Sequence, residues 1–233
     1  MQLFYNPDFN IQAPFLLEDE ARHCLKVLRI KKGDIVHVTD GNGNIFETRL
    51  LTEDPKKCQL QIISTQTESY KPYTIHIAIA PTKNADRTEW MVEKCVELGV
   101  DEISFIACEH SERKFFKTDR VEKIAIAAMK QSLKSRLPAI HEIISYKKFI
   151  EQPLPEQRFI AHLEEGKREL LQQLAQQGKE YCVLIGPEGD FSPEEIRLAQ
   201  AKGFLAVSLG ESRLRTETAG IVACHILNLI NSR

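Results

Sequence analysis

From residue 73 onward the hydrophobic positions alternate between two patterns. Short apolar runs, typical of buried strands, are each followed by a stretch with the 3.6-residue period of a helix. The strand-like runs are 73–80, 102–108, 158–163, 181–185 and 204–210, and the helix-like stretches are 86–98, 119–135, 167–177, 193–203 and 217–230. Strands that alternate in this way with helices predict an α/β fold with a mostly parallel sheet.

The first 70 residues have a different pattern. Two β-rich runs flank Asp40-Gly41-Asn42-Gly43, which is a hairpin signal, and residues 56–64 add another alternating strand. These short strands predict a small β-barrel. The polar stretch 67–74 with Pro72 then marks a boundary, so we expect one domain over residues 1–70 and another over 71–233.

The last helix-like stretch is apolar around most of its circumference, from Ile221 to Ile230. A helix of that kind is buried on two sides, either in a core or between subunits.

The composition describes an ordinary globular protein, with 42% hydrophobic and 27% charged residues. No apolar run approaches the roughly 20 residues of a membrane span, and the first ten residues lack the pattern of a signal peptide. The six cysteines are scattered without C-x-x-C spacing, which argues against a structural zinc site and against a disulfide framework. We therefore expect a protein of the reducing cytoplasm with no membrane contact and no metal.

The net charge of −2 conceals a basic segment. Residues 111–136 contain eight Lys or Arg against three acids, and Phe115 and Phe116 lie between cations. On a helix, Lys123, Lys130 and Lys134 would form one line. Such a segment is either a solvated helix face or a surface for nucleic acid. A second basic element spans residues 21–34, where a surface helix or loop is the plainer alternative to binding.

The loop that follows the strand-like run 181–185 consists of two parts. Ser192, Pro193 and Glu195 have the pattern of a helix start with a capping box. Residues 186–190, Gly-Pro-Glu-Gly-Asp, are not explained by that helix. They lie at the carboxyl end of a parallel strand, where α/β proteins bind ligands, and they form either a tight turn or a binding loop.

A second loop, Leu209-Gly210-Glu211-Ser212-Arg213-Leu214-Arg215, follows the next strand. Thr216 is the expected N-cap of the last helix, with Glu217 in its first turn. Capping does not explain Arg213 and Arg215. A P-loop, a strand-borne G-x-G-x-x-G and a complete zinc motif are all absent from the sequence, which argues against ordinary nucleotide hydrolysis and a Rossmann dinucleotide site.

These segments together resemble the RsmE family, the 16S ribosomal RNA uracil-N3 methyltransferases within the SPOUT class. The resemblance rests on "HCLKVLR" (23–29), "KNADRTEWMVEKCVELGV" (83–100), "SER" (111–113), "KQSLKSRLP" (130–138), "IGPEGDFSPEE" (185–195) and "LGESRLRTETA" (209–219). It implies an N-terminal PUA-like RNA-binding barrel and a C-terminal SPOUT domain with a deep trefoil knot. It also implies S-adenosylmethionine as cofactor, a homodimer, and 16S rRNA, within the small ribosomal subunit, as partner.

The candidate residues fall into three roles, of which the cofactor-binding role is the one that the resemblance implies residue by residue. Arg215 and Glu217 are the catalytic candidates. The cofactor-binding candidates are Leu163, Gly186, Pro187, Glu188, Gly189, Leu209, Gly210, Leu214, Thr216, Thr218 and Ala219. The RNA-binding candidates are Arg22, Arg29, Arg113, Lys130, Gln131, Lys134 and Arg136.

The sequence departs from the family pattern at two places. Asp190 stands where a further glycine is frequent, and the glutamate often found ahead of Gln131 is missing. Two alternatives stay open: methylation of a ribose 2′-oxygen on the same fold, and a non-enzymatic protein for RNA binding or ribosome assembly.

Overall fold

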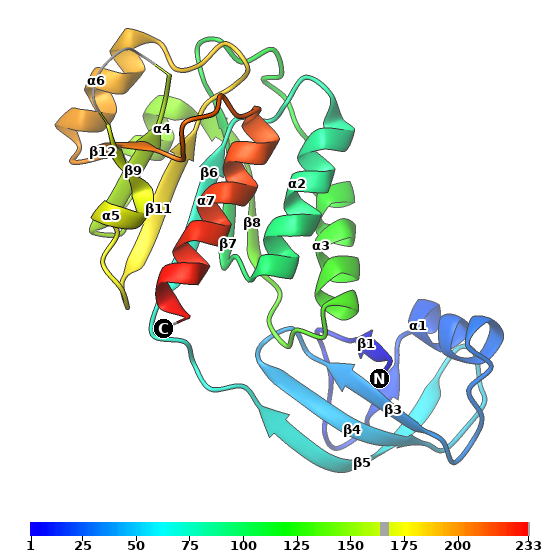
Figure 1. Cartoon of the computed structure of the whole chain (residues 1–233). Coiled ribbons are helices and arrows are strands. Elements are labelled where there is room, and N and C mark those ends of the chain that lie inside the picture. Colours follow the sequence, from blue (N-terminus) through cyan, green and yellow to red (C-terminus); the bar gives the residue numbers. More distant parts are fainter. Residues whose placement is uncertain (164–167, 233) are drawn as a thin grey trace. The chain divides into compact units, whose positions relative to one another are not determined.

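The chain folds into two compact units. The computed structural model describes residues 1–163 and 168–232 (Figure 1). Unit 1 comprises Met1–Tyr70 and Ile126–Leu137, and unit 2 comprises Lys71–Ala125 and Pro138–Arg233. Unit 1 therefore includes residues 126–137 from the middle of the chain, which a single boundary at residue 70 would place in the other domain.

Unit 1 is a small mixed β-structure. Its sheet has five strands in the order β1-β3-β4-β5-β2. The strands are β1 (Leu3–Tyr5), β2 (Phe15–Leu16), β3 (Ile35–Thr39), β4 (Asn44–Leu50) and β5 (Cys58–Thr67). Helix α1 (Glu18–Arg22) runs on into a π-helical turn, η1 (His23–Val27). The buried core of unit 1 contains Phe4, Leu16, Val38 and Leu50.

The predicted hairpin is confirmed, since β3 and β4 pair antiparallel on either side of residues 40–43. Its tip also binds the mid-chain segment. Thr39 Oγ1 donates to the Ser135 carbonyl at 3.0 Å, and Leu137 N donates to the Gly41 carbonyl at 2.9 Å. Gly43 has φ of +104°, and a Cβ atom there would lie 2.5 Å from Arg136 Nη2. Residues 126–137 are therefore built into unit 1.

Unit 2 has a seven-stranded sheet in the order β10-β12-β9-β11-β6-β7-β8. All of these neighbours pair in parallel, which confirms the α/β class. The strands are β6 (Thr74–Ile79), β7 (Glu102–Ala107), β8 (Ala139–Ser145), β9 (Gln157–Ala161), β10 (Glu169–Leu170), β11 (Glu180–Ile185) and β12 (Leu205–Ser208).

Helices cover both faces of this sheet. Those of unit 2 are α2 (Ala85–Leu98), α4 (Tyr146–Ile150), α5 (Leu171–Leu174), α6 (Pro193–Ala201) and α7 (Thr216–Asn231). Helix α3 (Asp119–Gln131) begins in unit 2 and ends in unit 1. Figure 1 shows α2 and α7 on one face, with α4 and α6 on the other. Tyr146, Phe149 and Ile196 fill the core on the α4 and α6 side. On the opposite side α7 packs closely, because a Cβ at Gly220 would lie 3.1 Å from Ile79 Cδ1.

Helix α3 is shorter than its hydrophobic pattern predicts. It ends at Gln131 rather than at residue 135, and Leu133 just beyond it has φ of +56°. Lys134 therefore lies outside the helix, and the predicted line of Lys123, Lys130 and Lys134 is wrong. The main-chain amides of residues 132–134 still bond back to α3, whereas the Ser135 carbonyl accepts hydrogen bonds from Thr39 and Gly43 of the unit 1 hairpin. The chain therefore leaves the helix before residue 135.

Two other stretches of unit 2 also differ from expectation. Of the helix predicted over 167–177, Lys167 lies outside the described residues, and the remainder forms β10 and the four-residue helix α5. Residues 139–150, for which no element was predicted, form β8 and α4. Strand β8 is at the edge of the sheet, and its burial pattern lacks a fully buried position that would have marked it as a strand.

The last segment of the chain turns back across the sheet. Strand β12 pairs with β9, beyond β11, whereas the following α7 packs against α2, β6 and β11. This return path is the one along which the predicted knot would be threaded. Among the described residues, no helix combines the length and apolar character that crossing a bilayer requires.

Candidate active site

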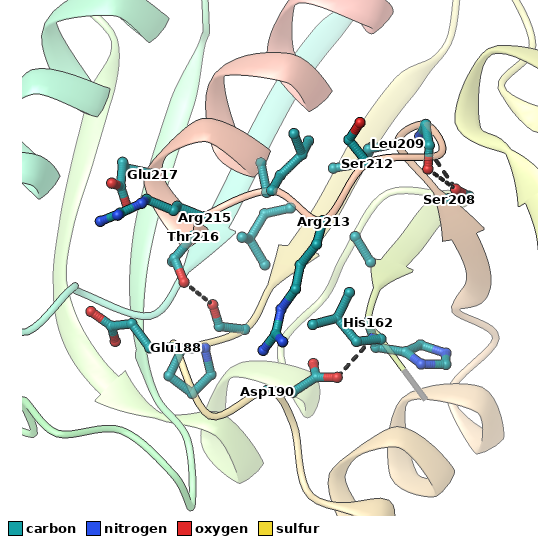
Figure 2. A pocket seen from close by; sticks show the side chains of 18 of the residues that line it. His162, Glu188, Asp190, Ser208, Leu209, Ser212, Arg213, Arg215, Thr216 and Glu217 are labelled. Atoms are coloured by element: carbon teal, nitrogen blue, oxygen red, sulfur yellow. Dashed lines mark hydrogen bonds between the residues drawn. The ribbon is translucent and has the colours of Figure 1, made fainter. Parts of the chain in front are cut away.

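A cavity of about 960 Å³ opens at the carboxyl ends of β9, β11 and β12. The walls come from the loops that follow these three strands and from the start of α7 (Figure 2). This is the edge at which parallel sheets place their ligands. The volume falls in the range of roughly 300–1,000 Å³ that is usual for small-molecule and cofactor sites.

The loop after β11 uses its glycines for close packing. Neither Gly186 nor Gly189 has a positive φ. A Cβ on Gly186 would lie 3.0 Å from the ring of Phe191, and one on Gly189 would lie 3.1 Å from His110 Cβ. The loop then enters α6 through the predicted capping box, in which Ser192 N donates to Glu195 Oε2 at 2.9 Å. Both glycines thus keep the cavity wall thin and fixed.

Asp190 is the residue of this loop that adopts a left-handed conformation, with φ of +63°. Glycine takes that conformation without strain. Aspartate tolerates it better than most residues because its short side chain bonds locally. Here Oδ1 accepts from Phe191 N at 2.8 Å and Oδ2 accepts from Leu163 N at 2.7 Å. The carboxylate therefore ties the end of β9 to the β11 loop.

The loop after β12 is also held by its own side chains. Gly210 has φ of +138°, which favours glycine. Ser208 Oγ accepts from Gly210 N at 3.2 Å and donates to the Gly210 carbonyl at 2.9 Å. Figure 2 shows Arg213 extending from this loop in the direction of Asp190.

The start of α7 differs from the prediction. Arg215, and not Thr216, is the N-cap residue, and it makes no side-chain capping bond. Thr216 is the first helical residue, and its hydroxyl donates to the Gly186 carbonyl at 3.1 Å. The threonine thus joins the two loops instead of capping the helix, and the prediction of a Thr216 N-cap is wrong.

Charges of both signs meet in this cavity. Its described lining contains four arginines and four acids: Arg87, Arg168, Arg213, Arg215, Glu188, Asp190, Glu211 and Glu217. Glu217 is only 6% exposed, and its Oε1 lies 3.7 Å from Arg87 Nη1. Glu188 Oε1 accepts from Lys83 N at 2.9 Å. A cavity of this kind suits a ligand that itself carries both charges.

The cavity brings nearly all of the predicted cofactor and catalytic residues together. All except Thr218 line it. It also contains residues for which no role was predicted, among them Arg87, His162, Arg168, Ser208 and Arg213. Arg87 lies in one of the family segments, but a single arginine on a helix gives no sign of its burial partner. Arg213 is marked in the sequence only as a charge that helix capping does not explain.

The predicted RNA-binding residues, in contrast, are dispersed. Arg113 belongs to unit 2, and Arg22, Arg29, Lys130, Gln131, Lys134 and Arg136 belong to unit 1. Lys130 Nζ lies 2.5 Å from Glu20 Oε1, with its side chain 21% exposed. Arg136 donates to the Asn42 carbonyl at 3.1 Å and lies over the ring of Tyr70. Lys130 and Arg136 therefore have structural partners inside unit 1, whereas Arg29 and Gln131 are exposed.

The cysteines lie apart from this chemistry. All six are free and buried. Burial raises the pKa of Cys24 to about 12 and that of Cys58 to about 11, and it raises the pKa of Cys108 and Cys182 further. Thiols of this kind stay protonated and inert. Among the described residues, no cluster of three or more His, Cys, Asp or Glu could hold a metal.

Comparisons with known proteins agree with this architecture. A model for an RNA methyltransferase domain matches residues 69–228, and one for an RNA methyltransferase PUA domain matches residues 16–63. A ribosomal RNA small subunit methyltransferase E from a Synechocystis strain is 30% identical, over 98% of this chain and 77% of that protein.

Two solved structures are similar along almost the whole chain. A protein from Porphyromonas gingivalis, described as a probable rRNA-methyltransferase, is 47% identical with a TM-score of 0.91, over 98% of this chain and 99% of the other. A ribosomal RNA small subunit methyltransferase E from Neisseria gonorrhoeae, bound to S-adenosyl methionine, is 26% identical with a TM-score of 0.87, over 99% and 98%.

The parallel sheet, the cavity at its carboxyl edge and the small β-domain thus define an RNA methyltransferase with a PUA domain. The chain belongs to the ribosomal RNA small subunit methyltransferase E family.

Proposed function

We propose that this protein transfers a methyl group from S-adenosylmethionine to N3 of a uridine in 16S rRNA. One observation carries the proposal. The loops 186–190 and 209–215, separated by a helix and a strand in the sequence, meet in one cavity of a chain that is similar along its length to a structure with that cofactor bound.

The cavity fits such a cofactor in its size and in its chemistry. The main chain of Gly186–Gly189 and Gly210 offers close hydrogen-bonding groups, and Leu163, Leu209 and Leu214 offer apolar surface for a ring. Acidic side chains can receive an ammonium group, and Arg213 can receive a carboxylate. When bound, the cofactor supplies an activated methyl group on a sulfonium centre.

The residues of this chain then align the base and manage its charge. Uracil N3 has a weakly acidic proton that must leave as N3 attacks the methyl group, so negative charge develops on the ring. Arg215, exposed at the N-terminus of α7, stabilises that charge. Glu217, held beside Arg87, orients the base or accepts its proton.

The same proposal includes the partners of the reaction. Exposed cations of unit 1, such as Arg29, bind rRNA phosphates, within the small ribosomal subunit and in the cytoplasm. The protein acts as a homodimer. Support comes from a groove of about 470 Å³ beside α7, where Ile226, Leu229 and Ile230 form an apolar wall opposite Gln172, Gln173 and Gln177. Leu229 is 50% exposed in the single chain, and a second subunit would cover it.

Mass mapping of ribosomal RNA tests the proposal directly. RNA from cells with and without the protein is digested and compared, and we expect one N3-methyluridine of the 16S rRNA to disappear with the protein. A lost ribose methylation would instead establish the 2′-oxygen alternative.

Calorimetry with S-adenosylmethionine tests the other alternative. We expect binding by the wild-type protein. An absence of binding would leave only a non-enzymatic role in RNA binding or ribosome assembly.

A further inference from the structure

Phe115 and Phe116 are neighbours in the sequence but differ in their surroundings. Phe116 is partly buried, and its ring centroid lies 4.5 Å from that of Phe105 on β7. Phe115 is 90% exposed, the highest value among the large hydrophobic side chains in the described part of the chain. A ring this exposed is barely covered by the folded chain, so both of its faces are open to a partner.

The loop that carries Phe115 is anchored to the wall of the cavity. His110 Nδ1 lies 3.2 Å from the Gly189 carbonyl oxygen and 3.1 Å from that of Asp190. Glu109 N donates to Glu195 Oε1, in the first turn of α6, at 2.9 Å. The first part of the loop is therefore fixed against the β11 loop.

A second anchor lies two residues before Phe115. Arg113 Nη2 donates to the Lys83 carbonyl at 2.9 Å, and Lys83 N in turn donates to Glu188 Oε1, which belongs to the cavity. Two residues of chain span at most about 7 Å. Phe115 therefore lies within about 7 Å of the main chain of Arg113, a residue that is linked through Lys83 to Glu188 of the cavity lining.

The charge around Phe115 suits a polyanion. Lys114 and Lys117 are exposed on either side of the two phenylalanines. The segment 111–118 contains three cations and a single acid, Glu112. The exposed Trp90 of the same unit lies in balanced surroundings, because one helical turn away on α2 it has the acids Asp86 and Glu93 and the bases Arg87 and Lys94.

The proposed reaction itself requires an unpaired base. N3 of uracil lies on the edge that forms Watson–Crick pairs, so the base must leave any helix before it can be methylated. Proteins hold such unpaired bases by stacking them on exposed aromatic rings between cations.

We propose that Phe115 stacks against an unpaired base of the substrate RNA and holds that strand at the entrance of the cofactor cavity, with Lys114 and Lys117 on its phosphates. The inference rests on the proposed RNA methylation and adds to it the residue that receives the nucleotide. Phe115 contacts the substrate but takes no part in the chemical step.

The test uses three substitutions of Phe115 that distinguish the loss of its aromatic face from the loss of side-chain volume. Methyl transfer is measured with labelled S-adenosylmethionine and small ribosomal subunits from cells that lack the protein. Phe115→Ala and Phe115→Leu should each lower kcat/KM for the subunits by about 10-fold, mainly through KM, and Phe115→Trp should stay within about 3-fold of the wild type. Calorimetric affinity for S-adenosylmethionine should be the same for all of them.

Trp90→Leu is the matched control, since it removes another exposed aromatic ring of unit 2, and it should behave as the wild type. The inference is overturned if Phe115→Leu is as active as Phe115→Trp, or if Phe115→Ala weakens cofactor binding as much as it weakens kcat/KM. A wild-type protein that transfers no methyl group to the subunits would overturn the proposed function as well, so the two failures are distinguishable.

Discussion

Unit 2 and unit 1 use charged and polar residues in different ways. In unit 2 the predicted cofactor residues lie on a few contiguous loops, and one cavity contains all of them except Thr218. In unit 1 the predicted RNA contacts come from separate parts of the chain, and Lys130 and Arg136 already have partners there. A site made of loops at strand ends can be predicted from short segments of sequence. A charged binding surface cannot, because it depends on which cations the fold leaves without an acidic partner.

The largest expected effect concerns acid stability, which should reside in unit 2. His76 on β6 lies 2.8 Å from Ser104 Oγ, and burial lowers the pKa of its imidazole to about 4, despite the nearby Glu102. Between pH 6.5 and 4 the unfolded chain takes up a proton that the folded protein does not. The free energy of unfolding should therefore fall with decreasing pH, by about 3 kcal/mol near pH 4. Above pH 7, where His76 is neutral in both states, its titration should add no pH dependence.

Urea unfolding between pH 4.5 and 7 measures this effect. Fluorescence of the single tryptophan, Trp90, follows unit 2. His76→Gln should flatten the pH dependence, and an equal slope in the variant and the wild type would contradict the prediction.

The next largest effect concerns Arg215. Replacing it by alanine should lower kcat for methyl transfer by about 100-fold, as the loss of one group that stabilises developing charge usually does. The affinity for S-adenosylmethionine, measured by calorimetry, should change less than about 3-fold. Arg197→Ala, which removes an exposed arginine on α6, is the control. Equal losses of rate and affinity would show that Arg215 holds the cofactor instead.

A smaller effect is expected at Asp190. Asp190→Gly relieves the left-handed φ but removes the bond to Leu163 N, so stability should stay within about 1 kcal/mol while cofactor affinity falls by about 10-fold. Asp190→Asn retains an acceptor and tolerates the conformation, and should stay within about 3-fold. Cofactor titrations of the two variants would refute this role if glycine bound as tightly as aspartate.

The smallest effect distinguishes two cations of unit 1. Arg29→Ala should reduce the slope of log affinity for rRNA against log salt by about 0.7–0.9, because one exposed phosphate contact is lost. Lys130→Ala should leave this slope unchanged and instead lower stability by about 1–2 kcal/mol, since it leaves the Glu20 carboxylate without its cationic partner. If Lys130→Ala reduced the slope as Arg29→Ala does, the ion pair would have to open for RNA.

Much of unit 2 could be predicted from its sequence because its central strands are continuous apolar runs between clear helix patterns. The capping box at Ser192 was predictable for the same local reason. Strand β8 was missed because an edge strand lacks such a run. The end of α3 does not follow from local spacing, because Ser135 and Leu137 just beyond it form hydrogen bonds with Thr39 and Gly41, each 96 positions earlier.

The cavity could be predicted in part. Glycines and conspicuous charges in the two loops marked its walls, and the family resemblance named most of them. The bonds that hold it together could not be predicted. Nothing in the sequence indicates that Thr216 reaches the Gly186 carbonyl instead of capping its helix, or that the carboxylate of Asp190 binds an amide at the end of another strand.

The membership of residues 126–137 in unit 1 has a practical meaning for dividing this protein. A fragment that ends at Tyr70 lacks the chain that supplies three partners of the β3–β4 hairpin, namely Ser135, Arg136 and Leu137. A fragment that begins at Lys71 carries those residues without their hairpin. One cut therefore yields no intact half, and the PUA-like part cannot be transplanted to another protein, or lost from this one, as a simple N-terminal piece.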